Sequence, residues 1–520
     1  TELFGTERNS YVPIIFLGTG DKGLWCFVEE FRDWAGDPGE SAVQVVRPEG
    51  GGVNLRVRFF AAPVELGRER HITFALLADP AKPTVDPIQP ERHWRRMAWG
   101  WNGEHHGGVY QHDTSGYRYW GGSVDGYENT DEDLDALRRF MEGEFRATWR
   151  RGKHVQGRFT SATEKGAPIV LYGSTSLTGL GLPAFDTYGG EWIGRTNWGT
   201  NPASKFKGLR NYQGTVTWDT PREMSVTGVN FTDSYMDCFV WYHMRLIENV
   251  PVNGTWWDNA SLTRITDYDP EREEFYTRYN VFTRRRLMKR LITAQYERDK
   301  RPLWINNMHV DWPFCQVSWH IENEFYIDSN FNTMQDHLSV DKFRAMCRIK
   351  RGIIHRLATR SPGGPSIHME QLRNRSIVGM CLLHDIGTYR WGSYAREMRR
   401  MPGILHEKVG FFDGAQFIGY WRSGNLVEIG ADPVYASVYQ GKGRAVIVVL
   451  NESRDPVDVP FEIRPDILPD KKEISRVYDA ETGYAFGQHW DKKQHRREWG
   501  EYHPGVFGIE GGGVRLIAVE

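Results

Sequence analysis

The sequence predicts an α/β protein in which a (β/α)8 TIM-type barrel is flanked by an N-terminal and a C-terminal antiparallel β-sandwich domain. Short apolar strands alternate with helices between about residues 92 and 415, which is typical of parallel strands with crossover helices. Period-two strand patterns come before and after this region. We therefore expect domains at residues 1–88, 89–415 and 416–520.

The N-terminal region is expected to be β. Its predicted strands are 12–17, 23–29, 53–60 and 71–77. In the third of these, polar and apolar residues alternate from Asn54 to Phe59. The prolines at 80, 83, 87 and 90 then predict an extended linker.

The central region supplies the barrel elements. Helices are predicted at 131–150, 234–249, 273–300 and 340–359. Strands are predicted at 168–172, 254–257, 302–306, 317–321, 366–369 and 377–383. The basic run Arg284-Arg285-Arg286 is expected on a solvated helix face. In the C-terminal region, strands are predicted at 434–439, 444–450, 456–463 and 514–519, and a long loop at 488–503.

Charge and cysteine content exclude several classes of function. The formal net charge is −2, which gives no electrostatic basis for binding nucleic acid or an anionic membrane. No apolar run approaches the roughly 20 residues that span a bilayer. The five cysteines are far apart and form no CxxC pair, so neither a metal nor a redox motif is expected. Phosphate-binding and dinucleotide-binding motifs are not found, and no cofactor is expected.

Aromatic residues are abundant, with 20 Trp, 23 Tyr and 26 Phe. Such residues suit a protein that stacks on sugar rings, and they equally suit a large hydrophobic core. In a barrel, catalytic groups follow the carboxyl ends of strands. The motif Gly254-Thr255-Trp256-Trp257-Asp258-Asn259 places Asp258 there. The alternative is that Asp258 caps the next helix or closes a turn.

A second pair of acids follows in Trp319-His320-Ile321-Glu322-Asn323-Glu324. Glu322 and Glu324 have the same strand parity, and two carboxylates on one side raise each other's pKa, which favours a proton donor near neutral pH. Alternatively, one of them pairs with an Arg of a neighbouring helix. At least one is expected to be catalytic, with Glu322 preferred.

Other polar groups are candidates for lining the cleft. Asp385 follows the strand predicted at 377–383 and is expected to position substrate. Further lining candidates are Tyr172, His309, Glu191 and Trp192. The segment from Trp101 to Trp120 contains Glu104, His105, His106, Tyr110, His112 and Asp113, but their spacing matches no zinc motif, and no metal site is expected.

Several short motifs resemble a bacterial domain family related to glycoside hydrolase family 123. They are Phe16-Leu17-Gly18, Lys22-Gly23-Leu24-Trp25-Cys26-Phe27 with Trp34, the exit Ala78-Asp79-Pro80-Ala81-Lys82-Pro83, and the strands ending at Asp258 and Glu322. The resemblance covers nearly the whole chain. It implies a glycosidase acting on an oligo- or polysaccharide in the secreted or periplasmic space. In the family an adjacent Asp-Glu pair supports substrate-assisted cleavage, whereas this chain has Asp258-Asn259, and an amide cannot donate that proton.

The predicted function is therefore glycosidic bond hydrolysis, with catalytic residues Asp258, Glu322 and Glu324. The predicted substrate-binding residues are Trp256, Trp257, Asn259, His309, Trp319, His320, Asp385 and Tyr172. If the substrate is uronic or sulfated, Arg118, Arg195 or Arg390 are candidates to bind it. Two alternatives remain open: a polysaccharide lyase or metal-assisted sugar enzyme, and a non-catalytic carbohydrate-binding protein.

Overall fold

The structure is a computed structural model. The described residues are 14–18, 22–30, 32–34, 42–60, 63–65, 67, 69–79, 95, 109–111, 135, 138–139, 170–174, 177–179, 183–192, 209–210, 215–216, 225–227, 230–258, 264–269, 271–300, 303–307, 320–326, 333–346, 354–360, 367–391, 395–468, 473–486, 488–491, 496–499 and 505–520. Among them, no helix combines the length and apolar character needed to cross a membrane.

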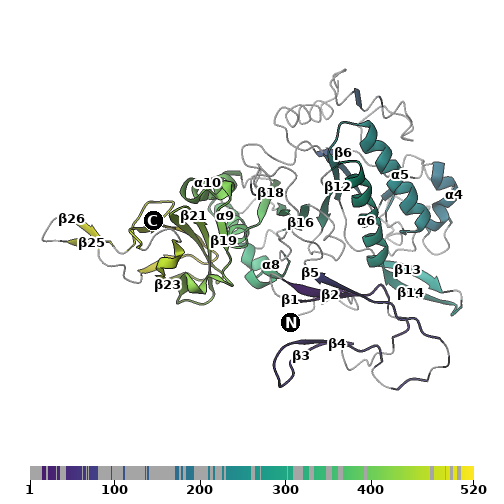
Figure 1. Ribbon diagram of the computed structural model, residues 1–520, viewed down its shortest axis with the longest axis horizontal. Coiled ribbons are helices and arrows are strands. Elements are labelled where there is room, and N and C mark those ends of the chain that lie inside the picture. The colour runs from purple at the N-terminus through teal and green to yellow at the C-terminus, as the bar shows by residue number, and fades with distance from the viewer. Residues whose placement is uncertain are drawn as a thin grey trace. The chain divides into compact units, whose positions relative to one another are not determined.

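The chain divides into two compact units. Figure 1 labels their helices and strands. The first unit consists of Thr1–Pro83, Gly108–Ile305 and Trp312–Ser318. The second consists of Thr84–Gly107, Asn306–Asp311 and Trp319–Glu520.

The first unit begins with small antiparallel sheets. Strands β1 (Ile14–Gly18), β2 (Gly23–Phe27) and β5 (Ala75–Asp79) form one, and β3 (Val43–Val46) pairs with β4 (Asn54–Val57). Gly18 and Gly23 are paired at the β1–β2 turn, and the Phe16 ring lies only 2.6 Å from where a Cβ on Gly18 would be. No larger residue fits there, which explains the glycine pair.

This N-terminal part is joined to a helix of the same unit by Glu29. Its Oε1 accepts hydrogen bonds from the backbone N–H groups of Phe282 (2.6 Å) and Thr283 (3.2 Å), at the start of α6 (Val281–Glu297). A carboxylate at a helix N-terminus satisfies free N–H groups and complements the helix dipole. Glu29 therefore caps α6 from a distant part of the sequence.

The larger part of the first unit is a parallel sheet with helices. Strands β6 (Val109–Gln111), β7 (Val170–Ser174), β12 (Gly254–Asp258) and β15 (Leu303–Asn307) lie side by side in that order. Helix α5 (Asp233–Asn249) precedes β12 and α6 follows it, and the two helices contact each other. The remaining elements are α4 (Pro183–Trp192) and the strand pairs β8 (Leu177–Gly179) with β11 (Ser225–Thr227), β9 (Leu209–Arg210) with β10 (Thr215–Val216), and β13 (Arg264–Asp269) with β14 (Glu274–Tyr279).

The second unit begins with three parallel strands, β16 (His320–Tyr326), β17 (Ile354–Arg360) and β18 (Gly387–Trp391). Its helices are α7 (Met334–His337), α8 (Val340–Met346), α9 (Ile367–Leu383) and α10 (Ala395–Val409). The order strand, helix, strand with parallel pairing is that of crossover units, as expected for an α/β fold.

The C-terminal part of this unit contains two antiparallel sheets. One holds β19 (Gln416–Ile418), β21 (Val434–Gly441), β22 (Arg444–Asn451), β28 (Val514–Val519) and β24 (Val477–Asp479), and the other β20 (Val427–Ile429), β23 (Val457–Ile463) and β27 (Gly505–Ile509). One hydrophobic cluster takes residues from both, including Ile447, Val459 and Phe461. The two sheets therefore pack on each other through a shared core.

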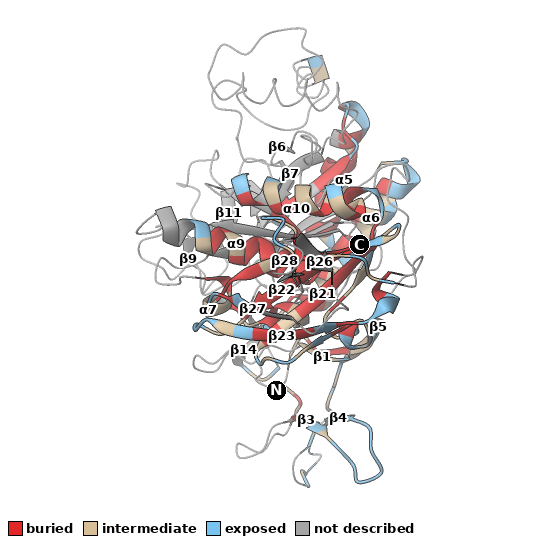
Figure 2. Cartoon of the chain, turned by 90° about the vertical axis from the view of Figure 1, so that its left-hand side faces the viewer, coloured by how far each residue is buried: buried red, intermediate tan, exposed pale blue. Residues whose placement is uncertain are grey.

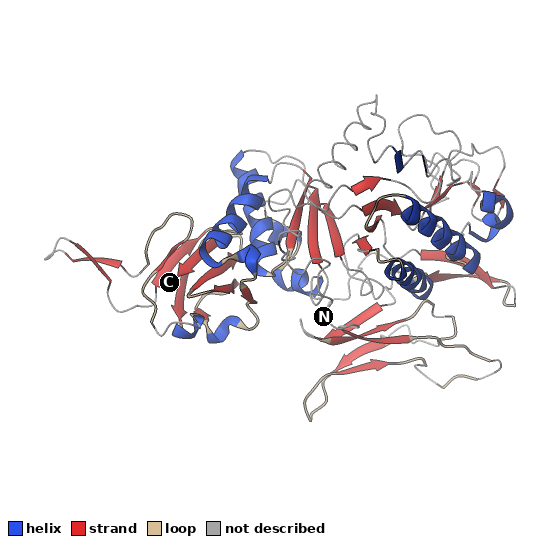
Figure 3. Cartoon of the chain, turned by 45° about the horizontal axis from the view of Figure 1, so that its top comes forward, coloured by secondary structure: helices blue, strands red, loops and turns tan. Residues whose placement is uncertain are grey.

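Strand β22 is buried on both faces (Figure 2). Ala445, Ile447 and Val449 belong to the core between the sheets. The intervening residues from Val446 to Leu450 are also buried, because α9 and α10 pack on that side (Figure 3). Gly379 of α9 approaches Val514 so closely that an added Cβ would lie 2.2 Å from its Cγ2.

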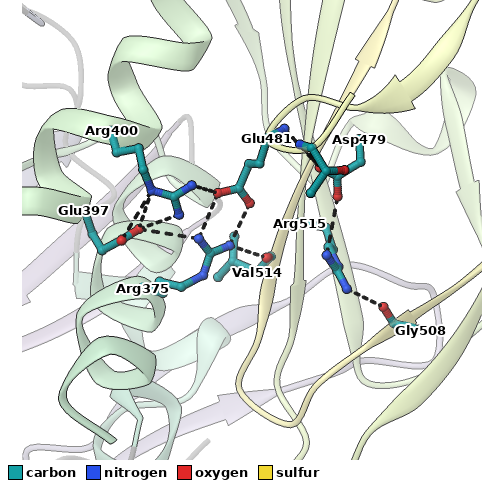
Figure 4. Close-up of polar contacts among 9 residues, drawn as sticks. Arg375, Glu397, Arg400, Asp479, Glu481, Gly508, Val514 and Arg515 are labelled. Carbon is teal, nitrogen blue, oxygen red and sulfur yellow. Dashed lines mark hydrogen bonds and ion pairs between the residues drawn. The ribbon is translucent and has the colours of Figure 1, made fainter. Parts of the chain in front are cut away.

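An ion-pair network joins these helices to the C-terminal sheet (Figure 4). Arg375 of α9 donates two hydrogen bonds to Glu481, from Nη1 to Oε1 (2.9 Å) and from Nη2 to Oε2 (2.8 Å). Arg400 of α10 contacts the same carboxylate, at 2.5 Å, and also Glu397. Nη2 of Arg375 further donates to the carbonyl of Val514 (2.9 Å). One carboxylate is thus shared by two guanidinium groups from two helices.

Several predicted elements are wrong. The segment 273–300 is strand β14 followed by α6, because Glu274–Tyr279 pairs with β13. The segment 340–359 begins with α8 and ends within β17. Of the strands expected at 366–369 and 377–383, residues 367–369 and 377–383 belong to α9. The expected loop 488–503 contains the paired strands β25 (Gln488–Asp491) and β26 (Arg496–Trp499). The helix expected at 131–150 lies outside the described residues, except at Asp135, Arg138 and Arg139, which are helical.

The basic run on α6 is also not the solvated face expected. Arg284 is fully buried, and its guanidinium lies 4.7 Å from the ring centroid of Phe231. Burial lowers the pKa of Arg285. Arg286 forms an exposed ion pair with Asp233 of α5. The run therefore connects α6 to α5 rather than only facing water.

Candidate functional site

The two faces of β12 have different surroundings. Thr255 and Trp257 are fully buried against the helices. Nε2 of Gln295 in α6 donates to Oγ1 of Thr255 (2.6 Å), and the ring of Trp257 lies 4.9 Å from those of Phe239 and His243 in α5. Because successive residues of a strand point to opposite faces, Trp256 and Asp258 occupy the face opposite to α5 and α6.

The neighbouring strands extend this second face, which we call the β12 open face. In the parallel register, Trp256 lies beside Tyr172 of β7 and Trp304 of β15. Asp258, the last residue of β12, lies beside Ser174, the last residue of β7. Gln111 of β6 continues the row of Tyr172. The β12 open face therefore carries three aromatic residues in one row and a carboxylate in the row nearer the strands' carboxyl ends.

This register corrects one predicted substrate contact and locates others. Trp257 is 0% exposed, so it has no surface with which to stack on a sugar, and its predicted role is wrong. Tyr110 lies beside Leu171 and Thr255, on the helix-covered face. Trp192 is also fully buried, and its Nε1 donates to Oγ of Ser234 (3.0 Å), so it packs α4 on α5 instead of lining a cleft.

The second unit shows the same division into two faces. Thr388 of β18 is buried and hydrogen-bonds to Cys381, so α9 covers the face on which it lies. Its register neighbours on that face are Leu357 and Asn323. Glu322 and Glu324 have the opposite parity. They therefore lie on the face of β16 opposite to α9, which we call the β16 open face.

Three rows of residues define the β16 open face. Nearest the carboxyl ends is the row Tyr326, Arg360 and Trp391; the next is Glu324, Ala358 and Tyr389; and the third is Glu322, Arg356 and Gly387. His320 lies below them beside Ile354. Sequence reasoning missed Arg356 and Arg360 because their strand was predicted as part of a helix. It missed Trp304 because the sequence does not specify which residue of 302–306 lies beside Trp256.

Asp385 was predicted to bind substrate at a strand end, and this prediction is wrong. It follows the C-terminus of α9 with φ of 54°, and it precedes β18 instead of following a strand. Its carboxylate, 8% exposed, receives two hydrogen bonds from Arg95, from Nε to Oδ1 (2.8 Å) and from Nη2 to Oδ2 (3.1 Å). Both oxygens are therefore engaged inside the protein, at the amino end of a parallel strand.

Other predicted residues lie outside the described part of the chain. They are Asn259, His309, Trp319, Glu104, His105, His106, His112, Asp113, Arg118 and Arg195. Arg390 is described in its backbone and shares the helix-covered face with Thr388. Within the described residues, no group of three or more His, Cys, Asp or Glu side chains is placed to hold a metal ion.

Comparisons with known proteins give weak structural similarities. No family model and no curated protein sequence matches the chain, so the likeness to glycoside hydrolase family 123 finds no support there. Among solved structures, the family 27 β-L-arabinopyranosidase of Geobacillus stearothermophilus is 11% identical with a TM-score of 0.41, covering 80% of this chain and 85% of its own. The α-amylase of Geobacillus thermoleovorans is 9% identical with a TM-score of 0.40, covering 83% and 99%. The debranching enzyme of Nostoc punctiforme is 9% identical with a TM-score of 0.38, covering 79% and 98%. Similarity at this level does not establish a common fold, and the function must rest on the chain's own residues.

Proposed function

We propose that the chain is a glycoside hydrolase acting on an oligo- or polysaccharide, with Asp258 and a glutamate of β16 as its carboxylates. One observation carries the proposal. Asp258 ends β12 on the open face, one row beyond the aromatic row Tyr172, Trp256 and Trp304. Aromatic rings that stack on sugars beside an acid at the carboxyl end of a parallel strand are what a barrel glycosidase requires.

The chemistry needs two carboxyl groups. One protonates the glycosidic oxygen, and the other either attacks the anomeric carbon or activates a water molecule. Asp258 is proposed for the second role and a glutamate of β16 for the first. In such enzymes a separation of about 5 Å gives retention and one of about 6.5–9.5 Å gives inversion, so the configuration of the product reports the geometry.

The finer architecture belongs to the same proposal. Parallel strands with helices on one face support a (β/α)8 barrel spanning 89–415. The antiparallel sheets that share a core support a C-terminal sandwich over 416–520, and the β1–β2–β5 sheet supports an N-terminal one over 1–88. We also retain as proposals the relationship to glycoside hydrolase family 123 and the secreted or periplasmic location.

The decisive experiment is a substrate screen with matched variants. Wild type, Asp258→Asn, Glu322→Gln and Glu324→Gln are incubated with aryl glycosides and natural polysaccharides, neutral and acidic, and released sugar is measured. Glu297→Gln, at the exposed end of α6, is the control for removing a carboxylate elsewhere. We expect wild-type and control turnover, and a loss of at least 100-fold in Asp258→Asn and in one glutamate variant.

Other outcomes select the alternatives. An unsaturated product that absorbs in the ultraviolet, together with inhibition by a chelator, indicates a lyase or metal-assisted enzyme. Sugar binding without turnover indicates a carbohydrate-binding protein. Full activity in Asp258→Asn excludes the proposed site.

A further inference from the structure

Three residues that follow β2 contact β14 and the turn before it, and we call Glu29, Arg32 and Asp33 the N-terminal clamp. The backbone carbonyl of Glu29 accepts a hydrogen bond from the N–H of Tyr279 (2.8 Å), the last residue of β14. The guanidinium of Arg32 lies 3.9 Å from the ring centroid of Tyr276, nearer the start of that strand. The clamp therefore runs beside β14 in the opposite direction, from the end of the strand toward the turn.

A buried ion pair joins the clamp to the turn between β13 and β14. Nη2 of Arg272 donates to Oδ1 of Asp33 (2.5 Å), and the two side chains are 17% and 6% exposed. Oδ2 of Asp33 accepts the backbone N–H of His71 (2.9 Å), so both carboxylate oxygens are engaged. The next residue of the turn, Glu273, has φ of 53°, which a residue other than glycine adopts only where its surroundings enforce it. The N-terminal region thus holds this turn in a defined conformation.

The ribbon of β13 and β14 needs such support because it has only two strands. The two strands pair with each other, and among the strands that the structure describes they have no third neighbour. A two-stranded hairpin by itself is only marginally stable in water. The position of the ribbon therefore depends on the contacts that the clamp makes with its turn and with β14.

This ribbon occupies the connection between β12 and α6. Strand β12 ends at Asp258, β13 begins at Arg264, and α6 begins at Val281, just after β14. In parallel α/β sheets, the connections from a strand to the next helix lie at the carboxyl ends of the strands, where substrates bind. Because Glu29 also caps α6, one clamp holds both the ribbon and the helix that follow Asp258.

We propose that the N-terminal clamp positions the β13–β14 ribbon as part of the sugar-binding site, with Asp33 and Arg272 as the positioning pair. This proposal rests on the proposed function, because the site concerned is the one that contains Asp258. A ribbon that is already held in place need not be ordered by the substrate, which preserves affinity. A polysaccharide extends past the cleaved bond and reaches the ribbon, whereas an aryl monosaccharide is too short to need it. The clamp thereby favours long substrates over short ones.

Hydrogen–deuterium exchange of the backbone tests the clamp without any substrate. In Arg272→Met and in Asp33→Asn we expect faster exchange over residues 264–279 and unchanged exchange over β12 and α5. Arg272→Lys, which keeps the positive charge, should restore most of the protection. Asp237→Asn is the matched control, because it removes a carboxylate from an exposed ion pair with Arg290 in the same unit. Unchanged exchange over the ribbon in both clamp variants overturns the proposal.

Kinetics separate the positioning role from the hydrolase itself. For Arg272→Met we expect a rise of about 10-fold in KM for a polysaccharide, because the ribbon must now be ordered on binding. Its kcat on an aryl monosaccharide should stay within about twofold of wild type. Faster exchange together with an unchanged KM for the polysaccharide places the ribbon outside the site, which overturns the positioning role and leaves the hydrolase.

A wild type that cleaves nothing overturns the hydrolase proposal, and retention on immobilised polysaccharide then replaces KM as the measurement. Weaker retention of Arg272→Met than of wild type supports the clamp, and equal retention overturns it. Thermal unfolding of each variant verifies that it is folded. If Asp33→Asn does not fold, Arg272→Met still decides the outcome, because Arg272 lies in the turn at the tip of the ribbon.

Discussion

The carboxylate of Asp385 and the guanidinium of Arg95 form a two-bond ion pair inside the second unit, 290 positions apart in sequence. Nη1 of Arg95 also donates to the carbonyls of Phe411 (3.0 Å) and Ala415 (2.6 Å). The hydroxyl of Tyr439 lies 3.4 Å from Oδ1 of Asp385. One arginine thus connects the end of α9 with the segment after α10.

Removing one partner of this pair should destabilise the protein and not weaken sugar binding. Arg95→Met or Asp385→Asn leaves polar groups buried without their partner, and we expect a loss of about 3–5 kcal/mol in the free energy of unfolding. Denaturant titration measures it. Arg454→Met removes a partner of Asp336 from an exposed position, and should cost under about 1 kcal/mol. Equal small losses in both would contradict a structural role for the Arg95–Asp385 pair.

The two adjacent tryptophans of β12 should respond oppositely to truncation. Trp257→Ala removes a fully buried ring and should cost about 3–5 kcal/mol of stability. Trp256 lies on the β12 open face. For Trp256→Ala we therefore expect a rise in KM for a sugar substrate and a much smaller change in unfolding temperature than for Trp257→Ala. Calorimetric unfolding and steady-state kinetics of both variants test this. A substrate-specific defect confined to Trp257→Ala would refute the assignment of faces.

His243 should make the first unit sensitive to acid. Burial lowers the pKa of His243 to about 3, and its Nε2 lies 3.1 Å from Nε2 of Gln295. The unfolded chain binds a proton at this position below about pH 6.5 and the folded chain does not. The contribution of the neutral His243 side chain to the free energy of unfolding is therefore fully present above pH 6.5. It is lost progressively as pH falls from 6.5 to 3, at up to about 1.4 kcal/mol per pH unit. We expect the free energy of unfolding to fall between pH 6.5 and pH 5 by about 2 kcal/mol less in His243→Gln than in wild type. Denaturant unfolding of both proteins at the two pH values measures this difference.

The network around Glu481 should also depend on pH. Burial alone would raise its pKa, but hydrogen bonds and charges from Arg375 and Arg400 outweigh burial and lower the pKa of Glu481. The ionised Glu481 therefore contributes to the free energy of unfolding at pH values above the ordinary pKa of a glutamate. This contribution is lost as pH falls below that pKa and through the lowered pKa of the folded state. Glu481→Gln should cost about 2–4 kcal/mol at pH 7, less than for a fully buried pair because Arg400 is partly exposed. The difference from wild type should shrink below pH 4, which unfolding curves at both pH values will show.

Strands that are short, apolar and bounded by turns could be predicted from the sequence. The strands expected at 254–257, 302–306 and 444–450 are examples, and residues 254–257, 303–306 and 444–450 lie in strands of the structure. Helix α9 could not be predicted, because its second half, residues 377–383, is an apolar run that is buried throughout. Such a run lacks the amphipathic period that identifies a surface helix.

The candidate site was predictable only in part, for a related reason. Asp258 could be found because it ends a clear strand. The neighbours that distinguish Glu322 from Glu324 come from β17, and no pattern in the sequence specifies which residue of one strand lies beside which residue of another. The role of Asp385 depended on Arg95, a partner that sequence separation conceals.

The alternation within Gly254–Asp258 also limits how the gene can change. A deletion or insertion of one residue within β12, before Trp256, would exchange the two faces of the rest of the strand. Trp256 would then be driven under the helices, and the charge of Asp258 would be buried among apolar side chains at a cost of several kcal/mol. Loss of the acid and loss of the core would occur in a single mutational step. We therefore expect insertions and deletions in this strand to cause misfolding. They should be as rare among natural variants as substitutions of Asp258 itself.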